Sequence, residues 1–91
     1  MTDVNTVLAE RGKRYGEFKN HAEIAQTLKS VMQTSGNANW DQLSNDQREA
    51  LEMIQHKIAR ILNGDPNYAD NWIDIAGYAT LVARRLDEVT A

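Results

Sequence analysis

Apolar residues recur every three to four positions along most of the chain, which is the period of an amphipathic helix. This pattern predicts a short helix from Asp3 to Arg11, a longer one after Asn20, a third after Ser44 and a fourth from about Tyr68 to Glu88. No run alternates apolar and polar residues as a strand would. The expected fold is therefore all-α: a small antiparallel bundle of about four helices, forming a single domain over residues 1–91.

Residues that begin and end helices support these boundaries. Asp3 or Asn5 is expected to cap the first helix, and two Ser/Asn-x-x-Gln/Glu patterns predict capping boxes. The patterns are Asn20 with Glu23 and Ser44 with Gln47. Glycines are expected to end the first three helices, at Gly12, at Gly36 in a left-handed conformation, and at Gly64 before the turn Asp65-Pro66-Asn67.

Each longer helix has a predicted core stripe. The stripes are Ile24, Ala25, Leu28, Val31 and Met32; Ala50, Leu51, Ile54, Ile58, Ile61 and Leu62; and Trp72, Ile75, Ala76, Ala79, Val82, Ala83 and Leu86. Ile73 and Leu81 lie away from the last stripe, and an apolar second side is most simply buried against another subunit. Gly77, inside the same helix, either admits a close neighbour or eases packing within the monomer, and both interpretations are open.

Composition and net charge narrow the classes of protein that fit this sequence. A chain of 91 residues without cysteine has a small core and no disulfide or thiolate staple, which favours a homo-oligomer. The net charge of −3 argues against a nucleic-acid-coating protein. No apolar run is long enough to span a bilayer, and residues 1–5 lack a signal peptide's basic and apolar regions. A cytoplasmic location is expected.

Two pairs of carboxylates could bind a divalent cation. Asp70 and Asp74 are separated by four residues and project from one face of the predicted helix, as Glu49 and Glu52 do at a spacing of three. Oxygen ligands of this kind suit Mg²⁺ or Mn²⁺. The spacing alone favours the simpler interpretation, in which all four are ordinary surface acids.

Cations and aromatic residues indicate where an anion could bind. Lys57 lies at the boundary between the apolar stripe and the polar face of the third helix, with Arg60 one turn on, so both are phosphate-binding candidates. Lys13, Arg14 and Tyr15 fall in a segment expected to be a loop able to hold an anion and stack on a base. In the alternative interpretation Tyr15 and Phe18 plug the bundle and the cations are solvated. His56 has no neighbouring histidine in the sequence, and His21 is expected at the surface.

The segments Lys57-Ile58-Ala59-Arg60-Ile61-Leu62 and Asp70-Asn71-Trp72-Ile73-Asp74-Ile75-Ala76-Gly77-Tyr78, with Tyr15-Gly16-Glu17-Phe18 upstream, resemble a group of short phage and prophage proteins. That group is similar to the MazG-like all-α nucleoside triphosphate pyrophosphatases. The resemblance covers about residues 11–86.

The resemblance implies a nucleotide ligand, a Mg²⁺ cofactor, an oligomer that completes the site, and, for a phage protein, the host cytoplasm. Glu49 and Glu52 match the superfamily's first acidic pair, and Asp74 matches the aspartate of the second. Asp74 and Glu52 would then be catalytic. Asn71 stands where the second pair's glutamate is expected, and Asp70 is displaced by one residue, so the resemblance leaves open a non-catalytic adaptor or host-modulating protein.

Overall fold

The computed structural model describes residues 3–90 as four α-helices and one short 3-10 turn. The helices are α1 (Val4–Tyr15), α2 (Phe18–Thr34), α3 (Asn45–Asn63) and α4 (Ala69–Thr90), and the turn is η1 (Trp40–Gln42). These residues contain no strand, so the predicted all-α fold is confirmed. The order and number of helices also agree with the apolar pattern.

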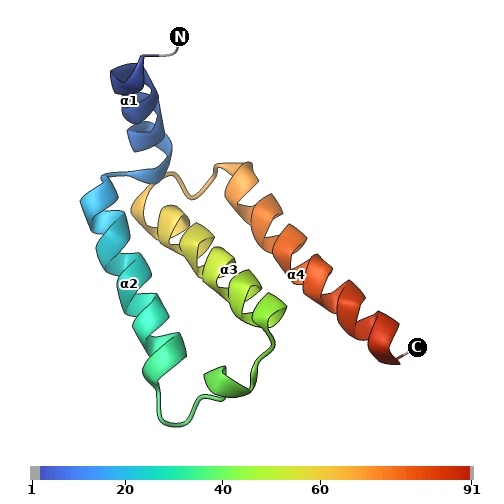
Figure 1. The fold of residues 1–91 in the computed structure, drawn as a ribbon. Helices are drawn as coiled ribbons and strands as arrows, with labels where there is room; N and C mark the ends of the chain where they lie inside the picture. Colours follow the sequence, from blue (N-terminus) through green and yellow to red (C-terminus); the bar gives the residue numbers. More distant parts are fainter. Residues whose placement is uncertain (1–2, 91) are drawn as a thin grey trace.

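The three longer helices lie side by side in one layer, with α3 between α2 and α4 (Figure 1). Short connections make neighbours in the layer antiparallel. The α1 helix projects from the end of the layer at which α2 begins and α3 ends, away from the layer (Figure 1). It contains no buried residue, so α1 contributes a wall beside the layer and no part of its core.

The predicted boundary between the first two helices was wrong. Gly12 lies inside α1, which continues to Tyr15 and ends where the Gly16 amide donates to the Gly12 carbonyl. The expected loop is therefore mostly helical, and Asn20 lies inside α2 because Glu17 is the N-cap. A single glycine costs a helix about 1 kcal/mol, which neighbouring helix-forming residues can outweigh.

Three other helix ends follow the predicted chemistry, and the end of α2 does not. Asp3 caps α1 by accepting from the Asn5 amide, and the Ser44–Gln47 capping box is formed in full. Gly64 ends α3 as expected. Gly36 follows α2 without adopting a left-handed conformation, because the extended residue Ser35 already turns the chain out of the helix.

The junction between α1 and α2 crosses directly against the junction between α3 and α4. The Asp65 amide donates to the Arg14 carbonyl at 2.7 Å. The Asn63 side-chain amide donates to the carbonyls of Tyr15 and Glu17, at 2.8 and 2.9 Å. A Cβ atom at Gly64 would overlap the backbone of Arg14 and Tyr15, so this contact requires glycine.

Polar side chains fasten α4 to α3 at both ends of their contact. Lys57 forms an ion pair with Asp74, with 3.1 Å between Nζ and Oδ2. Further along, the Arg85 guanidinium donates to both carboxylate oxygens of Asp46 at 2.7 and 2.9 Å. These hydrogen bonds, with a further one from Ser44, lower the pKa of Asp46 to about 2.

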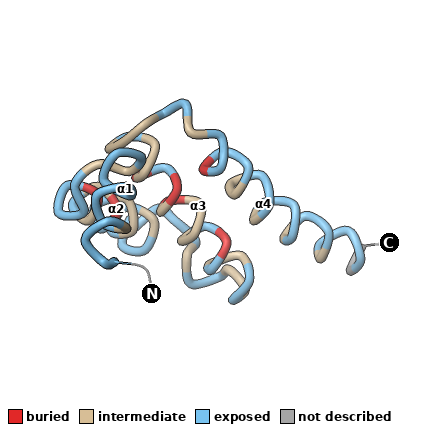
Figure 2. The backbone as a smooth tube through the Cα atoms, turned by 90° about the horizontal axis from the view of Figure 1, so that it is seen from above, coloured by how far each residue is buried: buried red, intermediate tan, exposed pale blue. Residues whose placement is uncertain are grey.

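The core is small, and the predicted core stripe of α4 was largely wrong. Among the residues whose burial is described, the buried apolar side chains are all alanines: Ala25, Ala50 and Ala59. The side of α4 that packs on α3 carries Asn71, Asp74, Ile75, Tyr78, Val82 and Arg85. The remaining members of the predicted stripe are exposed (Figure 2), because polar tethers rather than that stripe turn α4 toward α3.

An exposed apolar surface therefore runs along one face of the layer. On α3 it comprises Leu51, Ile58 and Leu62, which lie opposite Glu49, His56 and Arg60 on the helix. On α4 it comprises Trp72, Ala76, Ala79, Ala83 and Leu86.

The apolar stripe of α3 lies about 100° around the helix from the side that contacts α4, and the stripe of α4 lies about 100° from the side that contacts α3. Because α3 and α4 are antiparallel, the same sense of rotation brings both stripes to one side of the layer. We call this surface the apolar face, and the side with Glu49, His56 and Arg60 the polar face.

The second side of α4 is open as well. Ile73 and Leu81 are both 63% exposed, and beyond the chain neighbours of Gly77 and the backbone of its own helix, no atom of the described residues comes within 4 Å of a Cβ placed there. Gly77 therefore makes no room for a neighbour inside the monomer. Across the described residues, no helix combines the length and apolar character needed to cross a bilayer.

Replacing Gly64 by alanine tests the crossing of the two junctions. We expect a loss of about 3 kcal/mol or more in the free energy of unfolding, because the added methyl meets backbone that cannot move without breaking the Asp65–Arg14 hydrogen bond. Urea unfolding followed by far-ultraviolet circular dichroism measures this loss. Gly12→Ala is the matched control, since nothing lies within 4 Å of its Cβ, and it should leave stability unchanged or raise it by up to about 1 kcal/mol. Equal stability of the two variants would contradict the role of the crossing.

Candidate functional site

Two tyrosine rings at the crossing of the junctions bring together residues from α1, α3 and the start of α4. The rings of Tyr15 and Tyr68 meet edge to face, with centroids 6.1 Å apart. The Arg60 guanidinium lies 4.0 Å from the centroid of Tyr15 and the Arg14 guanidinium 4.7 Å from that of Tyr68. Cation–π contacts of this kind hold guanidinium groups in place without neutralising their charge. Three of the predicted anion-binding residues, Arg14, Tyr15 and Arg60, are thus gathered in one cluster.

Tyr68 links this cluster to a carboxylate. Arg14 Nη1 donates to the Tyr68 hydroxyl at 2.9 Å, and that hydroxyl donates to Asp70 Oδ2 at 2.8 Å. The hydrogen bond to Asp70 raises the pKa of Tyr68. Tyr68 was not among the predicted site residues, since it was interpreted only as the start of a helix. Its position next to the turn Asp65-Pro66-Asn67 was the available signal.

A pocket of about 440 Å³ opens beside Tyr15, between α1, the start of α2 and the end of α3. It is lined by Leu8, Arg11, Gly12, Tyr15, Gly16, Glu17, Phe18, His21, His56 and Arg60. Two guanidinium groups and one carboxylate give the pocket a net positive charge, and four of its lining residues carry aromatic rings. The pocket combines cations with flat apolar surfaces.

The rings of His21 and His56 meet at the pocket, with His21 Nε2 and His56 Nδ1 3.3 Å apart. The expectation that His21 is a surface residue was wrong, because α2 turns it onto α3 and leaves it 5% exposed. Burial and the charge of Arg60 lower the pKa of His21. Burial is also the main cause that lowers the pKa of His56 to about 4, with Arg60, His21, Lys57 and Lys29 adding to it. Both imidazoles are therefore neutral at pH 7.

The interpretation in which Phe18 plugs the bundle was wrong. Phe18 begins α2 at the pocket and is 79% exposed, so it is no core residue and does not plug the bundle. Its ring instead stacks against His21, with centroids 6.1 Å apart. Tyr15 is half-buried beneath Arg60, so of the two aromatic residues only Tyr15 has a packing role.

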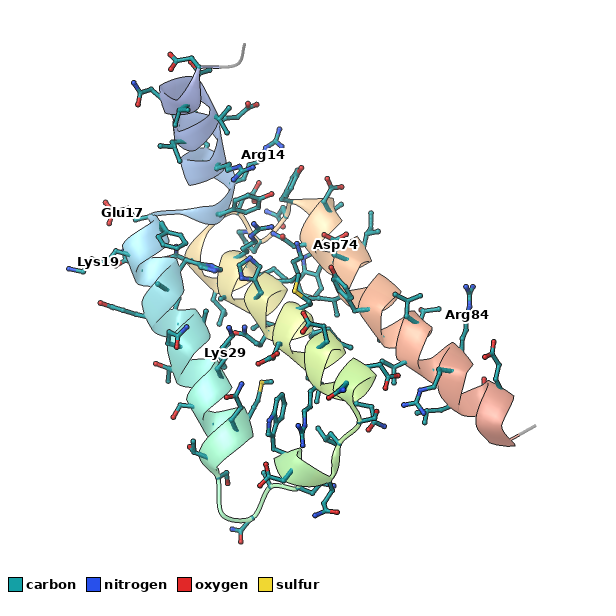
Figure 3. All side chains as sticks on the ribbon, in the orientation of Figure 1. Arg14, Glu17, Lys19, Lys29, Asp74 and Arg84 are labelled. Atoms are coloured by element: carbon teal, nitrogen blue, oxygen red, sulfur yellow. The ribbon has the colours of Figure 1, made fainter. Side chains whose placement is uncertain are left out.

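Three other predicted residues, Lys57, Asp74 and Lys13, do not join the tyrosine cluster. Lys57 is 8% exposed and points inward, as its place in the sequence indicated, but it pairs with Asp74. Figure 3 shows Asp74 between α3 and α4, whereas Arg14 lies at the base of α1. Lys13 is exposed on α1 and does not line the pocket.

The four predicted metal ligands do not converge within one chain. Glu52 accepts a hydrogen bond from Gln33 at 2.8 Å, Asp70 accepts from Tyr68, and Asp74 pairs with Lys57. Glu49 is exposed. In the described part of the chain, no three His, Asp or Glu residues form a group that could hold a metal ion. The donor set within one chain therefore does not fit the predicted Mg²⁺ site, and the Mg²⁺ cofactor stays a prediction.

Comparison with known proteins places the chain in a family. Residues 2–86 match the family described as domain of unknown function DUF6378. Because the match covers nearly the whole chain, the protein belongs to this family. No curated protein and no solved structure shows a significant match to the chain.

The histidine pair predicts how stability depends on pH. The unfolded histidines have a pKa near 6.5, and the folded protein lowers both values, so the unfolded state binds more protons as the solution is acidified. We expect a constant melting temperature above about pH 7 and a progressive fall between about pH 6.5 and pH 4. Thermal unfolding across this range measures it, and His56→Gln should flatten the fall. Asp46 acts in a separate window below about pH 4, because its pKa falls from 3.8 to about 2. A melting temperature independent of pH between 6.5 and 4 would contradict the burial of the pair.

Proposed function

We propose that the protein binds a nucleotide in the pocket between α1, α2 and α3. The observation that carries this proposal is the pocket's lining, in which Arg11 and Arg60 occur together with four ring-bearing residues, Tyr15, Phe18, His21 and His56. A nucleotide has the same two components, a charged phosphate end and a flat aromatic base.

The arginines suit the phosphate end. A guanidinium stacked on a ring keeps the N–H donors at its edge available, and their forked geometry matches two phosphate oxygens. Arg60 has this arrangement, because its flat side lies over Tyr15. Arg11 approaches from α1, so phosphate would be bound between two elements. Glu17 at the same pocket disfavours an anion close to its own carboxylate, which directs the phosphates toward Arg60.

The rings suit the base. The exposed ring of Phe18 offers a stacking surface, and base–aromatic stacking contributes about 1–3 kcal/mol per base. His21 Nε2 and His56 Nδ1 face each other and His21 Nδ1 is buried, so Nε2 of His56 is the imidazole nitrogen that could hydrogen-bond a base edge. The pocket volume of about 440 Å³ is within the range of small-ligand sites.

The proposal is limited to binding. The pyrophosphatase reaction that the resemblance implies needs carboxylates that share a divalent cation, and within one chain each of Glu52, Asp70 and Asp74 has a protein partner. Asn71, which occupies the place of an expected acid, is 1% exposed and therefore not available to a ligand at the surface.

A second candidate function is a non-catalytic helical adaptor that acts on another protein. The second exposed side of α4, where Ile73 and Leu81 are both 63% exposed, favours this role, since exposed apolar patches mark interaction surfaces. The two functions use different parts of the molecule and are distinguished by whether substitutions in the pocket alter a measurable binding reaction.

Calorimetric titration of the purified protein with ATP, dUTP and the corresponding nucleosides, with and without Mg²⁺, tests the proposal. We expect nucleotides to bind more tightly than nucleosides, and Arg60→Gln to weaken nucleotide binding about 10-fold or more, because a charge-assisted hydrogen bond contributes about 1.5–3 kcal/mol. Pyrophosphate release measured on the same samples reports any hydrolysis separately.

Arg84→Gln is the matched control. Arg84 is an exposed arginine on α4 that points away from α3 and the pocket (Figure 3), so the loss of its charge should leave binding unchanged. If both substitutions weaken binding equally, the ligand responds to net charge and the pocket is not its site. Absence of binding at millimolar nucleotide would overturn the proposal and leave the adaptor function.

A further inference from the structure

We propose that the apolar face is the interface with a second copy of this chain, so that two three-helix layers pack face to face. This inference is independent of nucleotide binding, because it uses the side of the layer opposite Glu49, His56 and Arg60. Three features of the chain favour a partner of identical sequence. They are its exposed area, the arrangement of residues on α4 and the symmetry of that arrangement.

The exposed area is too large for a compact monomer. The chain exposes 6693 Å², whereas a folded monomer of 10.3 kDa is expected to expose about 5,400 Å². Its radius of gyration is 15.5 Å, against about 12 Å for a compact chain of this length. Both α1, which projects from the layer, and the uncovered apolar face contribute to the excess.

The excess is of the size that a stable dimer buries. It amounts to about 1,300 Å² per chain, which sets an upper bound of about 2,600 Å² for the interface, since part of the excess belongs to α1. Obligate homodimers commonly bury about 2,000–5,000 Å² and have interfaces that resemble a domain core. Five of the large apolar side chains that the monomer leaves exposed are on that face, Trp72 at 55% and Leu62 at 66% exposed among them.

The stripe on α4 is arranged for contact with another helix. Trp72, Ala76, Ala79, Ala83 and Leu86 follow one another at spacings of four, three, four and three residues. This is the heptad spacing of helices that pack along their length. None of these positions, and none of Leu51, Ile58 and Leu62 on α3, carries a charge or a polar group that would need water.

The stripe is also self-complementary. It has large residues at both ends and three alanines in the middle, centred on Ala79. When two copies of α4 cross antiparallel about a two-fold axis at Ala79, the alanines allow the backbones to approach, and Trp72 of each copy lies beside Leu86 of the other. A two-fold interface requires such a match of one patch with itself.

Light scattering after size exclusion tests the stoichiometry. We expect a mass twice the 10.3 kDa of one chain at micromolar concentration. Ala79→Glu should convert the protein to a monomer with an unchanged helical circular dichroism spectrum, because the two-fold axis places two glutamates against each other. Ile73→Glu is the control on the other exposed side of α4 and should leave the dimer intact.

Cysteine cross-linking gives a second test that does not depend on a destabilising substitution. The chain has no cysteine, so Ala79→Cys introduces a single thiol at the proposed axis. We expect a short bis-maleimide to link two copies through position 79 efficiently, and Ile73→Cys to give at least tenfold less cross-linked product. A wild-type monomer at micromolar concentration, or efficient cross-linking at position 73 in place of 79, would overturn the proposal.

Discussion

The contact between two chain junctions holds the architecture of this protein together. The segment that joins α1 to α2 lies directly on the segment that joins α3 to α4, and the contact is made by backbone atoms and the Asn63 side chain. It leaves no room for a side chain at Gly64, nor at Gly16, which adopts a φ of 78°. Because Tyr15, Arg60 and Tyr68 all lie within a few residues of this crossing, it also assembles the polar cluster. Fold and candidate site therefore depend on the same contact.

The sequence predicted the number and type of elements because helix formation depends on local periodicity and capping. The Ser44–Gln47 capping box and the end of α3 at Gly64 are local features, and both were confirmed. The continuation of α1 through Gly12 was missed, since a glycine ends a helix only where the next residues cannot outweigh its cost. Boundaries near glycine are decided by the structure around them.

Side-chain partners were harder to predict, because they depend on how helices turn toward one another. Periodicity gave α4 one apolar stripe, but the pairs Lys57–Asp74 and Arg85–Asp46 direct a different side of α4 toward α3. Lys57 was expected to point inward and does, although its partner is an acid that had been assigned to a metal site. His21 and His56 are 35 residues apart in sequence, so no local pattern could place them in contact.

The position of α1 separates the lining of the pocket from the stability of the fold. In small proteins the same residues often serve both. This helix supplies Leu8 and Arg11 to the pocket but buries none of its own residues, and it is held mainly through the crossing at its C-terminal end. Substitutions along its outer turns can therefore change what the pocket admits while the three-helix layer keeps its stability. The residues that α1 contributes to the pocket are in that sense free to change on a single peripheral helix, without a compensating change in the scaffold.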